Sequence, residues 1–247
     1  MPGMTAWLDP LREALDESDT RIAFFFRDDD VGWANNEFRA LLACFRRNSV
    51  PIDLAVIPTA LTAEFAGEIW AMHDEVPGLI GIHQHGFSHT NHEVAGRKCE
   101  FGSSRTYQEQ FRDLQLGKIK LEVMLGSALD PIFTPPWNRC TEITGECLTE
   151  LGFSMLSRDA TAPSLALPGL KELPISIDWF AKKHRERLSC QALGTLIANM
   201  VKQKRPVGIM LHHELMSANE RDRIDDLLIL LSTHGQAHCK LMAEMSD

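Results

Sequence analysis

Three consecutive carboxylates, Asp28-Asp29-Asp30, follow an unusually apolar stretch near the start of the chain. Phe24 to Phe26, entered from Ile22, have the pattern of a buried strand. Adjacent carboxylates repel one another, and burial raises their pKa values unless a cation lies among them. An isolated acidic pair would usually be a turn that caps the strand. Three acids at the end of so apolar a strand favour a metal site or an acid/base site as strongly as that turn.

A second concentration of polar groups follows a later apolar strand, where His83, His85, His89 and His92 occur within one short segment. This density does not suit the usual role of a lone histidine as a hydrogen-bonded core or surface residue. His85 and His89 are four residues apart, a spacing typical of metal-binding pairs because one helical turn places both imidazoles on one side. With one carboxylate they form a set that suits zinc, iron, cobalt or nickel. His83 and His92 are less favoured as ligands.

Strands and helices alternate along the chain that must position these groups. The capping box of Thr106 and Glu109 predicts the start of a long helix. Such alternation predicts parallel βαβ units. About seven strand candidates suit either a distorted barrel or a doubly wound sheet. The strands are expected at 22–26, 51–58, 79–83, 131–133, 153–156, 173–177 and 207–211, with helices between them.

Polar clusters follow several of these strands. Besides the acids and the histidines, they are Trp137-Asn138-Arg139, Asp178-Trp179 and His212-His213-Glu214. In both architectures function lies at the carboxyl ends of the strands. The clusters therefore predict one site on one edge of the sheet.

Composition limits the function classes. A chain of 247 residues is expected to form a single domain over 1–247. Its formal charge of −9 and its lack of a Lys/Arg-rich block argue against a nucleic-acid partner. No signal peptide and no membrane span are recognised. The six cysteines are widely spaced without a Cys-x-x-Cys motif, which favours a reduced, cytoplasmic protein. The sequence does not indicate an oligomeric state.

These residues resemble the polysaccharide deacetylases, the NodB-homology or family 4 carbohydrate esterases. The resemblance covers about Ile22 to His213 and rests on five motifs in order. Asp29-Asp30 resembles the acid pair of the first, and the segment from His85 to His89 resembles His-x-x-Ser/Thr-His. The last three motifs are Thr134-Pro135-Pro136-Trp137, Asp178-Trp179 and Met210-Leu211-His212. The resemblance implies a single distorted (β/α) barrel domain and a metal-dependent hydrolase.

Metal ligands and a general base are the first roles that the resemblance implies. Asp30, His85 and His89 would hold one divalent metal, with zinc favoured over cobalt, nickel or iron. The metal would polarise an amide carbonyl and lower the pKa of a bound water. Asp29 would take the proton of that water. A register shifted by one residue, with Asp28 as the base and Asp29 as the ligand, is the alternative.

The remaining implied roles concern the oxyanion and the leaving amine. The backbone N–H of Trp137 would stabilise the developing oxyanion. His212 would protonate the leaving amine, and Asp178 would orient His212 and raise its pKa. His213 is a rival for the acid, because adjacent side chains of a strand point in opposite directions.

This chain also departs from the family pattern, since Thr134 stands where the family has an arginine that tethers the base. Arg139 or Arg27 would have to replace that arginine. Asp28 is an additional acid with no counterpart. Three residues are candidates for binding the substrate: Trp33 by stacking on a sugar ring, Arg97 in a basic loop, and Arg139. The alternative roles are packing for Trp33 and a solvated loop for Arg97.

The leading function is removal of an N-acetyl or related acyl group from an amino sugar or a sugar-containing precursor. The expected setting is surface-polysaccharide metabolism, with a small-molecule or oligosaccharide substrate. A hydrolase of a small cyclic amide or ureide is one alternative. A non-catalytic metal-binding relative is the other, although both the acid and the base positions hold suitable residue types.

Overall fold

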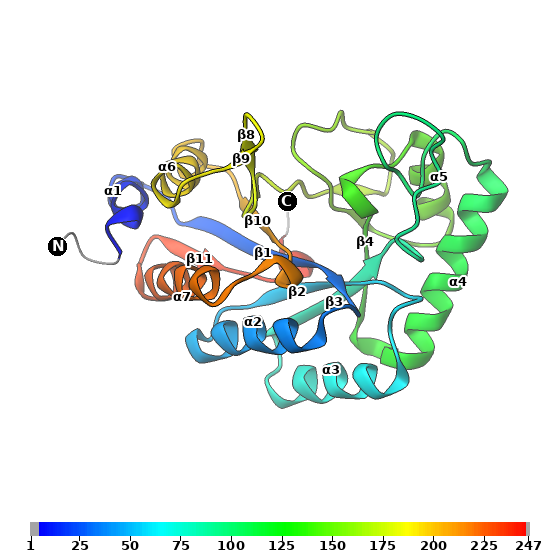
Figure 1. Cartoon of the computed structure of the whole chain (residues 1–247), viewed down its shortest axis with the longest axis horizontal. Helices are drawn as coiled ribbons and strands as arrows, with labels where there is room; N and C mark the ends of the chain where they lie inside the picture. Colours follow the sequence, from blue (N-terminus) through cyan, green and yellow to red (C-terminus); the bar gives the residue numbers. More distant parts are fainter. Residues whose placement is uncertain (1–4, 246–247) are drawn as a thin grey trace. The chain divides into compact units, whose positions relative to one another are not determined.

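The computed structural model describes residues 5–245, and Figure 1 shows its elements in chain order. The described chain divides into two compact units. The first contains residues 5–28, 34–52 and 176–245, and the second contains residues 29–33 and 53–175. The first strand, β1 (Ile22–Val31), supplies residues to both units. The expectation of a single domain over 1–247 stays a prediction.

Parallel pairing around β1 organises the first unit. β1 pairs with β10 (Val207–Leu211) and with β11 (Ala237–Cys239), and β10 pairs with β7 (Ile177–Asp178). The side chains of Phe24, Phe25 and Phe26 are fully buried, as the apolar pattern predicts. The register places Asp28 opposite Leu211, so the acidic end of β1 lies beside the end of β10.

The helices of the first unit pack in two pairs. The helix α1 (Asp9–Asp16) packs on α6 (Cys190–Val201), and α2 (Asn35–Asn48) packs on α7 (Ala218–Thr233). The shorter elements of this unit are η1 (Ala6–Leu8), β8 (Lys182–Lys183), β9 (Glu186–Arg187), η4 (His213–Leu215) and η5 (Met242–Glu244).

The second unit contains a run of strands in the order β2, β3, β4, β5, β6. The pairs from β3 to β6 are parallel. An aromatic and aliphatic core packs in this unit, and it includes Phe101, Phe133, Phe153 and Leu148. The strands are β2 (Ile52–Val56), β3 (Ile80–His85), β4 (Leu129–Thr134), β5 (Met155–Leu156) and β6 (Lys171–Glu172). The helices are α3 (Ala63–Glu75), α4 (Tyr107–Leu125), η2 (Gly126–Ala128), η3 (Pro136–Asn138) and α5 (Glu142–Glu150).

Most predicted elements form, and the differences have local causes. The capping box of Thr106 and Glu109 is present in full at the start of α4. The strand β1 is longer than predicted, because Asp28 to Asp30 continue it rather than follow it. The helix α1 was not predicted, since its segment reads as polar. The described residues form eleven strands instead of about seven, but only β1, β2, β3, β4 and β10 have five or more residues. No helix of the described chain is long and apolar enough to cross a membrane.

Two helical glycines provide a test of the packing. A Cβ atom on Gly194 in α6 would collide with the backbone carbonyl of Trp7, whereas one on Gly67 in α3 would meet no atom. We expect Gly194→Ala to lower the free energy of unfolding by about 1–3 kcal/mol, because overpacking forces the backbone to move. Gly67→Ala should raise it by roughly 0.5–1 kcal/mol through helix propensity. Thermal unfolding measures both, and equal melting temperatures would contradict the close contact.

Candidate metal centre and surrounding residues

The end of β1 turns sharply at Asp30. The backbone of Asp30 is left-handed, with φ of 67°, a conformation that Asp adopts more readily than most residues. The N–H of Trp33 donates to the carbonyl of Asp30 at 3.2 Å and closes the turn. The carboxylate of Asp30 is thereby held at the tip of the strand.

The two histidines come from a strand end and the loop after it. His85 is the last residue of β3, and His89 lies four residues on with a left-handed backbone. The helical turn that the spacing suggested is therefore not what brings them together. Gly86 is also left-handed, and a Cβ atom there would collide with Glu100 and Pro136. The loop between the histidines consequently requires glycine at this position.

The loop is held by a buried carboxylate. Glu100 has no solvent exposure. Its two oxygens accept hydrogen bonds from the N–H of Phe87 at 3.1 Å, and from the N–H and hydroxyl of Ser88 at 2.7 and 2.9 Å. Because hydrogen bonds to a charged acceptor are strong, Glu100 fixes the path of the chain between His85 and His89. The role of Glu100 was not predicted, because no sequence motif distinguishes it from other acids.

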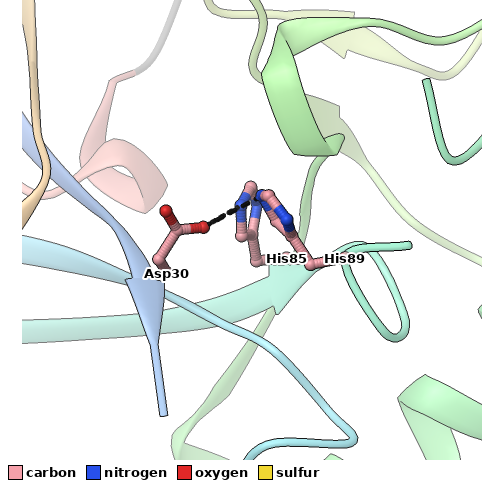
Figure 2. Close-up of side chains that lie close together, drawn as sticks. All are labelled: Asp30, His85 and His89. Atoms are coloured by element: carbon pink, nitrogen blue, oxygen red, sulfur yellow. Dashed lines mark hydrogen bonds and ion pairs between the residues drawn. The ribbon is translucent and has the colours of Figure 1, made fainter. Parts of the chain in front are cut away.

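Asp30, His85 and His89 converge on one point (Figure 2). The Nε2 atoms of His85 and His89 each lie 3.1 Å from the same oxygen, Oδ1 of Asp30. Burial alone would raise the pKa of Asp30, but the hydrogen bonds and charges of the two histidines outweigh burial and lower it. Among the described residues, this is the one group of three or more His, Cys, Asp or Glu side chains whose ligand atoms lie close enough together to share a metal ion.

The orientation of His85 depends on β4. Thr134 pairs with His85 in the sheet, and its carbonyl accepts a hydrogen bond from Nδ1 of His85 at 3.0 Å. That bond leaves Nε2 of His85 directed at Asp30, which is the arrangement by which an outer hydrogen bond orients a metal ligand. The hydroxyl of Thr134 lies 2.9 Å from Nε2 of His83. Thr134 therefore contacts two histidines, His85 through its carbonyl and His83 through its hydroxyl.

Two tryptophans flank His89. The ring of Trp33 contacts the imidazole edge-on at 5.1 Å between centroids, and the ring of Trp137 lies at 4.4 Å. Trp137 has a left-handed backbone, and the N–H of Asn138 closes the turn on Pro135 at 3.0 Å. Trp33 thus contacts His89 on one side, while its side chain is one of the exposed large hydrophobic ones, with 37% exposure.

The cationic candidates have different surroundings. Arg139 donates to the carbonyl of Lys98 at 3.0 Å, so it holds the loop before Glu100. Lys98 places its ammonium group 5.8 Å from the centre of the Trp137 ring. Arg97 is exposed, and no ion pair of Arg97 occurs within the described residues. Arg27 is fully buried and its Nη2 contacts Sδ of Met210 at 3.2 Å.

The predicted acid and base residues are placed as follows. Asp29 is buried near the end of β1, and His212 is the partly exposed residue after β10. Asp178 lies opposite Met210 in the sheet, and its Oδ1 accepts the N–H of Phe180 at 2.8 Å. His213 is fully buried, and its Nδ1 lies 2.7 Å from Oδ2 of Asp28. The additional acid, Asp28, therefore has a partner that the sequence did not reveal.

Known structures share this fold. No protein-family model matches the sequence, and no curated protein matches it. A protein from Mycobacterium smegmatis assigned to the polysaccharide deacetylases is similar over 92% of this chain and 89% of its own, with a TM-score of 0.68 and 15% identity. A Streptococcus mutans CE4 esterase is similar over 95% of this chain and 90% of its own, with a TM-score of 0.62 and 11% identity.

A third similar structure is described as a CE4 family pseudoenzyme from Bacillus anthracis. It covers 93% of this chain and 66% of its own length, with a TM-score of 0.59 and 10% identity. Together these likenesses show that the chain has the α/β fold of the NodB-homology deacetylases and family 4 carbohydrate esterases. The predicted fold class is confirmed.

Removal of the Glu100 carboxylate tests the role of the loop. We expect Glu100→Ala to weaken zinc binding roughly 10–100-fold, the range for residues that orient metal ligands, because the chain between His85 and His89 loses three hydrogen bonds. Titration calorimetry with zinc measures the change. Glu146→Ala, at an exposed position of α5, is the matched control. Unchanged zinc affinity in Glu100→Ala would contradict this role.

Proposed function

We propose that the protein is a metal-dependent deacetylase that removes an N-acetyl or related acyl group from an amino sugar or sugar-containing precursor. The observation that carries the proposal is the convergence of Asp30, His85 and His89 in a chain with the fold of carbohydrate esterases. Fold alone does not specify an activity. The ligand set is what ties this chain to hydrolytic metal chemistry.

The three residues fit a divalent metal ion. Zinc bonds to imidazole nitrogen and carboxylate oxygen at about 2.0–2.2 Å, so neighbouring ligand atoms in a tetrahedral site lie roughly 3.3 Å apart. The observed distances of 3.1 Å from Nε2 of each histidine to Oδ1 of Asp30 are close to this ligand–ligand distance. Three protein ligands with an open position are typical of catalytic zinc sites. When bound, the metal would supply Lewis-acid activation of water and of the acyl carbonyl.

Four further residues have distinct proposed roles in the reaction. Asp29 accepts the proton of the attacking water, and the N–H of Trp137 donates to the developing oxyanion. His212 gives a proton to the leaving amine, and Asp178 orients His212 for this transfer. The partial exposure of His212, against full burial of His213, supports His212 as the acid. The place of Asp30 beside both histidines supports Asp29–Asp30 as the base and ligand pair.

The substrate class follows from the same surroundings. Trp33 presents exposed ring surface next to His89, as a sugar-stacking residue would. Arg97 and Arg139 are the proposed contacts for polar or anionic groups of the substrate. The proposed setting is surface-polysaccharide metabolism in the cytoplasm.

Cysteine-based hydrolysis is not supported. Burial raises the pKa of Cys99, and it raises that of Cys140 to about 12. A nucleophilic cysteine needs a lowered pKa. The thiols near the Trp137 turn are therefore poor nucleophiles.

A non-catalytic relative is the second candidate, because a pseudoenzyme is among the similar structures. Acetate release from N-acetylated amino sugars by the metal-loaded protein separates the two functions. Ring opening of a cyclic imide or ureide without acetate release would instead favour the small-amide hydrolase.

The metal assignment predicts the behaviour of three histidine variants. His85→Ala and His89→Ala should each remove most bound zinc, since each deletes one of three ligands. His92→Ala is the control, because His92 is exposed and outside the group. Elemental analysis of the purified variants measures the metal. A double variant of His85 and His89 with full metal occupancy would exclude this site.

The acid assignment predicts a separation of turnover from metal binding. His212→Ala should lower turnover by roughly 10²–10⁴-fold, the usual contribution of a general acid, with zinc content unchanged. Asp178→Asn should also lower turnover with zinc content unchanged, because the carboxylate proposed to orient His212 is lost. Normal turnover of His212→Ala together with an inactive His213→Asn would reverse the assignment.

A further inference from the structure

Asp28 and His213 form a pair with no solvent exposure in the first unit. Oδ1 of Asp28 accepts the backbone N–H of His213 at 3.0 Å, and Oδ2 accepts Nδ1–H of the same residue at 2.7 Å. Both oxygens of one carboxylate thus bind one residue. A buried carboxylate is costly unless it is hydrogen-bonded, so this pairing is what allows an acid at position 28.

The fold enforces this contact from two sides. Asp28 lies opposite Leu211 on β10, and His213 is two residues further along the chain. The ring of Phe38, from α2, packs edge-on against the imidazole of His213 at 5.7 Å between centroids. His213 therefore has a fixed ring and a fixed backbone N–H.

The residue that benefits is His212. Its peptide bond to His213 carries the N–H that Asp28 binds. Its own carbonyl accepts the N–H of Leu215 at 3.0 Å and closes the short helix η4. The backbone on the C-terminal side of His212 is thus held at both its N–H and its carbonyl ends, while the side chain of His212 remains partly exposed.

We propose that Asp28 and His213 are positioning residues that hold His212 in place to deliver its proton. This inference rests on the proposed function. In that reaction water adds to the acyl carbon, the C–N bond breaks, and the proton of His212 passes to the amine nitrogen, leaving a carboxylate and an amine. The three neighbouring aspartates then have different roles. Asp28 positions the general acid His212, Asp29 is the general base, and Asp30 binds the metal.

A misplaced general acid slows the cleavage only of those bonds whose leaving group must be protonated. An amine must be protonated to leave, whereas 4-nitrophenolate leaves an aryl acetate without one. Loss of the Asp28 contacts should therefore slow hydrolysis of an N-acetyl amino sugar by about 10²-fold, the cost of a small misplacement. Hydrolysis of 4-nitrophenyl acetate should change less than threefold by the same reasoning.

The experiment compares disruptive and conservative variants of both residues. Asp28→Ala and His213→Ala should show the substrate-selective loss in kcat, with KM and zinc content unchanged. His213→Asn is the matched conservative variant, because its side-chain N–H can replace Nδ1–H as a donor to Asp28. It should retain most amide turnover. Asp28→Asn should be intermediate, since it keeps an oxygen for the backbone N–H of His213.

A double-variant cycle tests whether Asp28 acts through His212. Asp28→Ala should cause no further loss in a His212→Ala background, because coupled residues are not additive. An equal loss on both substrates, or an additive loss in the double variant, would overturn the positioning role and leave the proposed function standing. An inactive His213→Asn would show that His213 is itself the acid. Absence of acetate release by the unmodified, zinc-loaded protein would instead overturn the proposed function.

Discussion

The structure depends on how three adjacent carboxylates are compensated at the end of an apolar strand. Each carboxylate that leaves water needs hydrogen bonds or positive charge. Asp28 binds the backbone N–H and the ring Nδ1 of His213, and Asp30 lies against two imidazoles. These partners come from chain segments far away in sequence. The acidic strand end is therefore tolerated only when β3, β10 and their following turns are in place.

Much of the fold was predictable from local signals. The apolar triplet of Phe24 to Phe26, the capping box of α4 and the alternation of strands with helices each specify structure within a few residues. The grouping of Asp30 with His85 and His89 was implied by the resemblance to the polysaccharide deacetylases. The structural cause of that grouping was not predicted. A strand end and a left-handed loop bring His85 and His89 together, whereas the spacing suggested a helical turn.

The residues that escaped prediction act through long-range contacts. Glu100 holds the loop between the histidines from a segment with no motif of its own. Thr134 lies in a recognised motif, but nothing in that motif indicates that its carbonyl orients His85. The partner of Asp28 lies 185 positions away. Buried polar pairs of this kind depend on strand register, and register cannot be read from periodicity alone because alternative pairings preserve the same pattern.

Several non-glycine residues at or beside the candidate metal centre have left-handed backbone conformations. Asp30, His89, Trp137 and Asn138 all have φ between 55° and 67°. Such a conformation costs a non-glycine residue roughly 1–2 kcal/mol. Glycine at these positions would relieve that strain while deleting the side chains that form the site. Selection for stability and selection for chemistry therefore oppose each other here, and a lineage that no longer needed the activity would be free to drift toward a more stable, inert protein.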